Sequence, residues 1–448
     1  MKKGLFFALA ASSLLLGACS SDDAVVNTVG QNEAVQQIVL QVASSGDGLT
    51  TRAGRPLYSS QALQTIQNVR VVIYNATTKA IVKDTKLDWK ESTIYKTNGH
   101  GRQFTISLKG DNRLAEGNYK VMAVGYSEGS DYTYALDVTG EDLTGKTYSD
   151  ITATLKAGKV AEEVFAGDAD LKINADKKIT NLTEGEENGV AVTLHRQVAG
   201  SFGYFQNIPA SVNGKIAKTL RLVVRDKNDM LTFKDFNSSF TANGATGSTV
   251  KYYVNGSKST AAPASDAQFK GGDNGYVLYS IDLSKWFTNG DKNKDGLLNA
   301  EDTWQHPGDV KTQVVQGSVF GSSFVIPFNL TSGKSTMELQ LLDAEGNIIK
   351  FWTVSIPSTD VNSDDTKGVT DENASIFNVV RNHMYNLGVK TSNGTTDPDP
   401  SNPTPDPDPD KPKPEPGTDQ PEDLSKSQNL ILKVNDNWEA IHKLVLGD

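Results

Sequence analysis

Short runs of alternating hydrophobic and polar residues recur between residues 69 and 389. Side chains of an extended strand point alternately to opposite faces, so such runs predict strands with one buried face. The first series comprises Val69–Tyr74, Phe104–Leu108, Tyr119–Tyr126, Ile151–Leu155 and Ala191–Leu194. The second comprises Leu220–Val224, Tyr252–Val254, Tyr276–Ile281, Phe324–Phe328, Met337–Leu342 and Ile348–Ile356. No run shows the helical period over three or more turns.

Glycine, asparagine and aspartate separate the predicted strands and mark the turns. Asp343-Ala344-Glu345-Gly346 stands between two strands and predicts a tight hairpin. Many short strands with such turns favour β-sandwiches over a barrel or an α/β sheet. We therefore predict an all-β protein with two sandwiches in tandem, over residues 53–198 and 199–390.

One strand pattern occurs twice, near the start and near the end of the chain. Residues 38–42 read Ile-Val-Leu-Gln-Val, and residues 430–434 read Leu-Ile-Leu-Lys-Val. Each places three aliphatic side chains on one face of an extended strand: Ile38, Leu40 and Val42, or Leu430, Leu432 and Val434. If the early strand is removed, this likeness predicts its replacement by the late strand of another molecule.

The composition changes abruptly after residue 390. Residues 394–424 hold ten of the sixteen prolines, which favour an extended polyproline II conformation, so residues 391–424 are a predicted linker. Apolar residues return in residues 425–448, where Trp438, Ile441, Leu444 and Leu446 follow the late strand. Because apolar side chains need a place to be buried, we predict that residues 425–448 form a donor segment for another molecule.

Residues 1–18 have the features of a bacterial signal peptide, with Lys2 and Lys3 followed by the apolar run Leu5–Leu16. The run is too short for a comfortable membrane span. Leu16-Gly17-Ala18-Cys19 resembles a lipobox, in which Cys19 becomes the acylated first residue. The acidic residues that follow resemble the surface-export signal of Bacteroidetes lipoproteins. We therefore predict an outer-membrane lipoprotein precursor with residues 19–52 as its propeptide.

A processing site is predicted in Thr50-Thr51-Arg52-Ala53-Gly54-Arg55, which is polar and built of small residues. Such a segment suits a trypsin-like protease, which needs an exposed, extended substrate. Cleavage between Arg52 and Ala53 would release the lipid anchor together with the 38–42 strand. The groove left behind would offer unpaired backbone groups to a strand of another chain. An uncut, permanently anchored lipoprotein is the alternative.

These motifs together resemble fimbrillins, the subunits of Bacteroidetes type V pili. The resemblance rests on the lipobox, the Thr-Arg-Ala-Gly region, the segments Val192–Ala199 and Val380–Tyr385, and the Asp-Pro linker before a tryptophan-containing end. It implies two transthyretin-like, Greek-key sandwiches, cleavage by an Arg-specific protease at Arg52, and polymerisation by C-terminal donor-strand exchange. It also implies that the partners are identical or related fimbrial subunits and that the cut protein resides in an extracellular, adhesive fimbria.

Residues 291–302 have the ligand spacing of an EF-hand-type calcium loop. Oxygen-bearing side chains stand at loop positions 1, 3, 5, 9 and 12, and a backbone carbonyl serves at position 7. The predicted ligands are Asp291, Asn293, Asp295, Leu297, Asn299 and Asp302. Asp302 stands where glutamate is usual, as in the dockerin variant. A polar loop that joins two strands without metal is the alternative.

The composition excludes several classes of function. The formal net charge of −10 argues against a nucleic-acid partner. Cys19 is the only cysteine, so the exported body has neither a disulfide nor a cysteine nucleophile. The five histidines lack metal-ligand spacing, and no catalytic motif occurs, so we predict that the protein is not an enzyme. The alternatives to a main subunit are an accessory or tip adhesin, and a non-polymerising glycan-binding surface lipoprotein.

Overall fold

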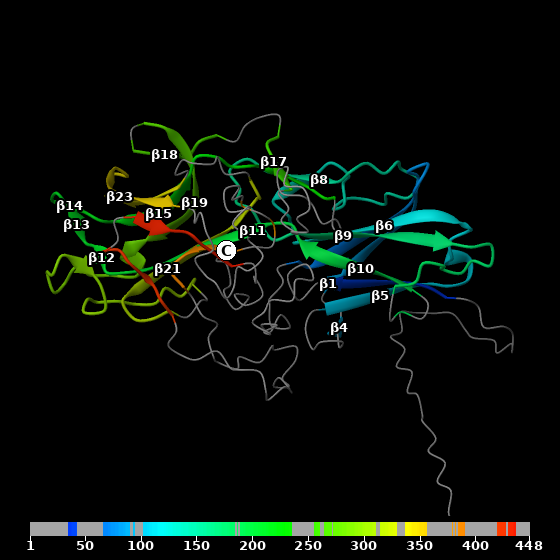
Figure 1. Ribbon diagram of the computed structural model, residues 1–448, viewed down its shortest axis with the longest axis horizontal. Coiled ribbons are helices and arrows are strands. Elements are labelled where there is room, and N and C mark those ends of the chain that lie inside the picture. The colour runs from blue at the N-terminus through cyan, green and yellow to red at the C-terminus, as the bar shows by residue number, and fades with distance from the viewer. Residues whose placement is uncertain are drawn as a thin grey trace, which may run out of the picture.

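The computed structural model describes residues 35–42, 66–89, 93–94, 102–183, 186, 189–234, 255–259, 264–270, 272–310, 314–328, 337–355, 379, 381, 384–389, 419–426 and 429–435. These residues form an all-β protein without α-helix, as the sequence predicts. None of the described segments is a helix long and apolar enough to cross a membrane. The strands gather into two sandwiches, which lie at opposite ends of the molecule in Figure 1.

The first sandwich has two layers. One layer has the order β3 (Ile81–Asp88), β2 (Asn68–Asn75), β6 (Gly117–Tyr126) and β9 (Phe165–Ile173). The other has the order β10 (Gly189–Arg196), β1 (Gln36–Val42), β5 (Arg102–Leu108) and β4 (Thr93–Ile94). The last residues of β10 pair with β9 and its first six with β1, so β10 joins the two layers. A core of aliphatic side chains, including Ile38, Leu40, Val71 and Val121, fills the space between them.

The outer face of β2 is buried as well, although alternating hydrophobicity predicts one buried face. Val71 and Ile73 belong to the core between the layers, whereas Val72 and Tyr74 belong to a second core outside it. Segment 132–151 supplies many of the apolar side chains that cover this outer face, so both faces of the strand are buried. The prediction of a strand is confirmed, but the prediction of a single buried face is wrong here.

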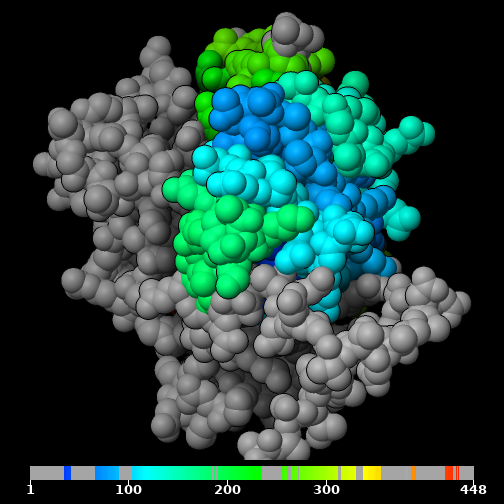
Figure 2. Space-filling model, turned by 90° about the vertical axis from the view of Figure 1, so that its right-hand side faces the viewer, coloured from blue at the N-terminus to red at the C-terminus, as the bar shows by residue number. Residues whose placement is uncertain are grey.

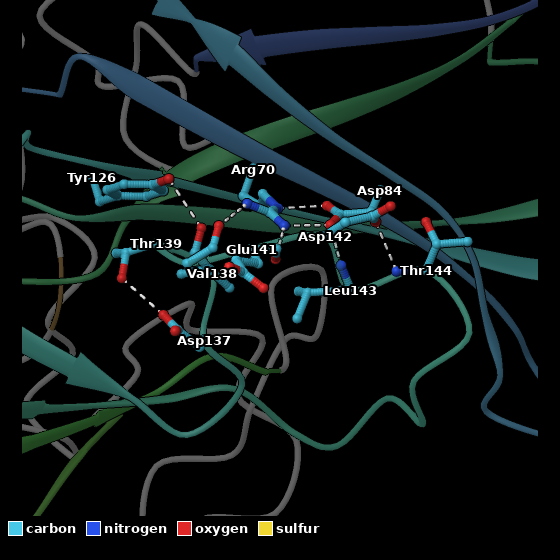
Figure 3. Close-up of polar contacts among 11 residues, drawn as sticks. Arg70, Asp84, Tyr126, Asp137, Val138, Thr139, Glu141, Asp142, Leu143 and Thr144 are labelled. Carbon is cyan, nitrogen blue, oxygen red and sulfur yellow. Dashed lines mark hydrogen bonds and ion pairs between the residues drawn. The ribbon is translucent and has the colours of Figure 1, made fainter.

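A buried ion pair holds part of this cover in place (Figure 3). The Arg70 guanidinium on β2 pairs with the Asp84 carboxylate on β3, and both side chains are less than 5% exposed. Arg70 also donates to the carbonyl oxygens of Gly140 (3.0 Å) and Glu141 (2.6 Å), while Asp84 accepts from the Leu143 N–H (2.6 Å). Because these three hydrogen bonds all end on residues 140–143 of the covering segment, the ion pair links that segment to β2 and β3. From its end, the first sandwich shows the blue β2–β3, cyan and teal segments beside a large green one (Figure 2).

The second sandwich also has two layers. One has the order β18 (Ala267–Gln268), β19 (Asn274–Asp282), β15 (Thr219–Val224), β22 (Met337–Leu342), β23 (Ile348–Ser355) and β26 (Asn429–Ile431). The other has the order β21 (Ser318–Val325), β11 (Ala199–Gln206), β24 (Met384–Leu387) and β27 (Lys433–Asn435), with β25 (Glu422–Asp423) also on β11. Two small ladders, β12 (Ile208–Pro209) with β20 (Leu297–Leu298) and β13 (Ser211–Val212) with β14 (Lys215–Ile216), flank it.

A four-stranded sheet joins the two sandwiches. Its order is β17 (Gly256–Ser257), β16 (Met230–Thr232), β8 (Thr152–Leu155) and β7 (Tyr132–Tyr134), and Figure 1 shows β17 and β8 in the region between the two ends. Leu231 and Phe233 enter the outer core of the first sandwich. Nearby, the buried Asn255 amide donates to both the carbonyl oxygen (3.1 Å) and Oε1 (3.0 Å) of Gln197. We call this sheet and its contacts the shared sheet.

Most predicted strands are confirmed by the described residues; Tyr252–Val254 lies outside them. Only Phe324 and Val325 of the predicted run Phe324–Phe328 lie in a strand, at the end of the longer β21, whose Gly321, Ser322 and Ser323 carry little hydrophobic signal. Phe328 forms an isolated bridge with Val379. The predicted hairpin at residues 343–346 is confirmed between β22 and β23. The Asp343 N–H donates to the Asn347 carbonyl (3.0 Å), and Gly346 takes the positive φ (+84°) that the turn requires.

Candidate strand-exchange site

The early strand β1 lies inside a sheet of the first sandwich rather than at its edge. Residues 37–42 pair in parallel with β10, and residues 36–41 pair in antiparallel fashion with β5. Ile38 and Leu40 are fully buried, and only the backbone of Val42 is described. Removal of β1 would therefore separate β10 from β5 and expose a ladder edge on each side of an apolar groove.

Gln36 anchors the start of β1. Its side-chain amide donates to the carbonyl oxygens of Leu114 and Lys177 at 3.0 Å each, and its Oε1 accepts from the Leu114 N–H at 2.8 Å. The backbone of β1 also approaches β10 closely, because a Cβ atom at Gly189 would lie 2.9 Å from the Gln37 carbonyl oxygen. The sequence gives no periodic signal for Gln36, so its role was missed. The only sequence signal for Gln36 is that it is a polar residue before an apolar strand.

The late strand lies on the second sandwich of its own chain. β26 pairs in parallel with β23, and β27 pairs in antiparallel fashion with β24. Leu430 and Leu432 are fully buried in the second core. Only the backbone of Val434 is described, while Trp438, Leu444 and Leu446 lie outside the described residues. The strand therefore reaches across from one layer of the second sandwich to the other.

Residues 419–426 lead into this strand and are themselves docked. Gln420 and Val389 exchange two backbone hydrogen bonds, of 2.7 and 2.8 Å, and the Leu424 N–H donates to the Gln206 carbonyl at 3.1 Å. Leu424 is fully buried, although it falls within the predicted linker. Its signal, Asp423-Leu424-Ser425 directly after the prolines, is an Asx-turn pattern that the prediction missed.

Asp423 stabilises the turn that follows. Burial opposes ionisation of its carboxyl group, but hydrogen bonds from Ser425 and from its other neighbours lower the pKa of Asp423 to about 2. The ordinary pKa of aspartate is about 3.9 in an unfolded chain. The stabilisation is therefore fully present above about pH 4 and is lost as the pH falls towards 2.

The remaining predicted processing residues, Cys19, Arg52 and Ala53, lie outside the described residues. The structure thus describes the strand that processing would remove, but neither the lipid-bearing cysteine nor the cleavage point. These residues stay predictions.

The loop of residues 291–302 has the turn geometry that its motif predicts. Gly296 has a positive φ (+87°), and its N–H donates to Asp291 Oδ2 at 2.9 Å. The hydrophobic Leu298 is buried and pairs with Ile208, which pins the loop to the second sandwich. Hydrogen bonds from the Leu297 N–H and from Asn293 hold the pKa of Asp295 below its ordinary value, so this carboxylate is ionised at neutral pH.

The ligand side chains of this loop fit a cation in part. Asp291 Oδ1 is a buried oxygen without a hydrogen-bond partner, as a metal ligand would be. Asp302, in contrast, accepts from the N–H groups of Lys292 (2.8 Å) and Asn299 (3.0 Å). Among the described residues no three His, Cys, Asp or Glu side chains gather closely enough to hold a metal ion. A cation here would therefore also need the amide oxygens and the Leu297 carbonyl.

No family model matches the chain, and no curated protein matches it in sequence. Three similar solved structures are a candidate adhesin from Bacteroides ovatus, a fimbrial assembly protein from Parabacteroides distasonis and the fimbrial anchor protein Mfa2 from Porphyromonas gingivalis. Their identities are 10%, 13% and 11%, and their TM-scores 0.37, 0.33 and 0.34. The matches cover 79%, 80% and 79% of this chain and 90%, 91% and 90% of the others. At these TM-scores the superpositions are loose, and the all-β assignment rests on the strands themselves.

Proposed function

We propose that this chain is a structural subunit of an adhesive fimbria on the bacterial surface. It is exported as an outer-membrane lipoprotein through Cys19, and an Arg-specific, trypsin-like protease hydrolyses the Arg52–Ala53 bond. β1 then leaves the first sandwich, and the C-terminal segment of another copy fills its groove. Because a subunit with a donor segment can bind a further subunit, this segment favours a place in the main stalk over a tip position.

The observation that carries this proposal is the internal position of β1. A strand at an edge has one ladder partner, but β1 has ladder partners on both sides and two fully buried aliphatic side chains. Burial of such a side chain contributes about 1.5–3 kcal/mol, so an empty groove binds a matching strand strongly. While β1 is in place, the same groove is closed and premature assembly is blocked.

Substitution of Arg52 is expected to stop maturation. Arg52→Ala should leave the lipidated precursor uncut and monomeric on cells, because a trypsin-like protease needs a basic residue before the cleaved bond. Arg55→Ala, three residues further on, is the matched control and should be processed normally. Mass spectrometry of surface material gives the readout: Ala53 as the first residue supports the pilin, whereas a retained, acylated Cys19 in the unmodified chain would favour a glycan-binding lipoprotein.

We also propose that residues 291–302 bind Ca²⁺. The turn at Gly296, the ionised Asp295 and the buried, unpartnered Oδ1 of Asp291 support this proposal. When bound, the cation would supply charge neutralisation that rigidifies the loop. The chain would contribute Asp291, Asn293, Asp295, Asn299 and Asp302 through side chains, and Leu297 through its carbonyl.

Calorimetry tests the calcium proposal directly. Titration with Ca²⁺ is expected to release heat in the unmodified chain at up to millimolar concentration, and Asp291→Ala should abolish it. Lys294→Ala is the matched control, because position 4 of the loop contributes no ligand. No heat in the unmodified chain, or an unchanged titration in Asp291→Ala, would leave the loop as a polar connection without metal.

A further inference from the structure

The C-terminal strand completes the second sandwich in much the way that β1 completes the first. β1 is parallel to β10 and antiparallel to β5, while β26 is parallel to β23 and β27 antiparallel to β24. The two cases differ in one respect. Residues 37–41 of β1 pair with both neighbours, whereas β26 pairs only with β23 and β27, further along the chain, only with β24. Each half of the late strand lies at the edge of its own layer, so the whole strand has a parallel neighbour in one layer and an antiparallel neighbour in the other.

The two strands also match in length and in the side chains that they bury. β1 has seven residues, and residues 429–435 also number seven, as three in β26, Leu432 and three in β27. Ile38 and Leu40 are fully buried in one sandwich, and Leu430 and Leu432, which hold the same places in the pattern, are fully buried in the other. Each strand therefore buries two aliphatic side chains that lie two residues apart on the same face.

The uncut chain has two such strands for two grooves. If residues 19–52 are removed, one strand remains, so each subunit has one groove too many. A C-terminal strand that leaves for a neighbour's first sandwich opens the place of Leu430 and Leu432 in its own second sandwich. It also leaves residues 353–355 of β23 and residues 384–386 of β24 without their ladder partners.

We infer that the place of residues 429–435 along β23 and β24 is a second strand-acceptor site, and that its occupant after exchange is the cut strand Gln36–Val42. This inference rests on the proposed function, because proteolysis supplies the strand and polymerisation empties the groove. The occupant restores two buried aliphatic side chains and the lost ladder bonds, so the second sandwich stays closed while its own strand serves the next subunit. The excised strand is thus reused rather than discarded.

A nicked, monomeric chain tests the inference. A recognition sequence for a site-specific protease is inserted at Ser427-Gln428, between β25 and β26, in the full uncut chain. After the cut, residues 429–448 are held by contacts alone and exchange with added peptide. A fluorescent peptide of residues 35–43, in large molar excess, is expected to displace them, with a rise in polarisation and release of the C-terminal fragment.

The matched control peptide carries Leu40→Asp. It should bind on the order of 100-fold more weakly, because a carboxylate is costly to bury in an apolar groove. β1 still fills the first sandwich in this chain, so binding there does not contribute. If the fragment stays bound, if it leaves and the 35–43 peptide does not bind, or if both peptides bind equally, the inference is wrong. A peptide of residues 428–436 verifies that the emptied groove still accepts a strand.

This result and a failure of the proposed function are distinguishable. The nicked chain needs neither processing at Arg52 nor polymer to give a signal. Conversely, a chain that is cut at Arg52 and forms no fibres would contradict the proposed function, whatever the peptide does.

Discussion

Deletion of residues 425–448 is expected to abolish fibres and to destabilise the monomer. The deletion removes the proposed donor segment, so a cut subunit can accept a strand but offers none. It also removes Leu430 and Leu432 from the core of the second sandwich, where both are fully buried. Loss of one buried leucine side chain costs about 2–5 kcal/mol. Electron microscopy of processed material and urea denaturation of the monomer measure the two effects separately.

A shorter deletion separates assembly from stability. Removal of residues 436–448 keeps β26 and β27, so the free energy of unfolding of the monomer should stay close to that of the full chain. It removes Trp438, Leu444 and Leu446 from the proposed donor, and the yield of fibres should fall. Long fibres from the chain that lacks residues 425–448 would show that this segment is not the donor.

The double substitution Ile38→Ala/Leu40→Ala is expected to weaken the precursor and to leave the mature subunit unchanged. Both side chains are fully buried in the first sandwich, and each truncation costs about 2–5 kcal/mol while β1 is present. After cleavage at Arg52 and separation from residues 19–52, the altered strand is gone, so the cut protein is identical to that from the unmodified chain. Urea denaturation before and after trypsin treatment measures the difference.

The matched pair is Leu430→Ala/Leu432→Ala, which makes the same truncations in the late strand. Because this strand is retained, stability should fall before and after cleavage alike, and the yield of fibres after cleavage should fall as well. If the Ile38→Ala/Leu40→Ala protein stayed weakened after complete cleavage at Arg52 and separation from residues 19–52, β1 would not be the strand that processing removes.

The strands themselves were predictable because each carries its own local signal. Alternating side chains in Val69–Tyr74 or Met337–Leu342 report a pleated strand whatever its neighbours are. The partners of a strand were not predictable, since pairing depends on residues far apart in the chain. Nothing in residues 38–42 indicates that β5 and β10 flank them. The cover on the outer face of β2 likewise comes from a distant segment.

The candidate site was predictable in its residues but not in its arrangement. The sequence predicts that the apolar side chains of Leu430 and Leu432 need burial, and both are fully buried in the structure. A hydrophobic pattern states that a strand needs burial, but it does not state in which molecule. A groove of its own chain satisfies Leu430 and Leu432 as well as a neighbour's groove does. The docked Leu424 was missed because a single leucine after a proline-rich stretch has no periodicity.

If the chain is exported as proposed, the shared sheet has a consequence for the order in which it folds. A polypeptide that crosses a membrane from its N-terminus usually closes its first domain before the next one emerges. Here the outer core of the first sandwich requires Leu231 and Phe233, and Ile326 from much further along also belongs to it. The first sandwich must therefore wait, with that face open to water, until well over half of the chain has been translocated.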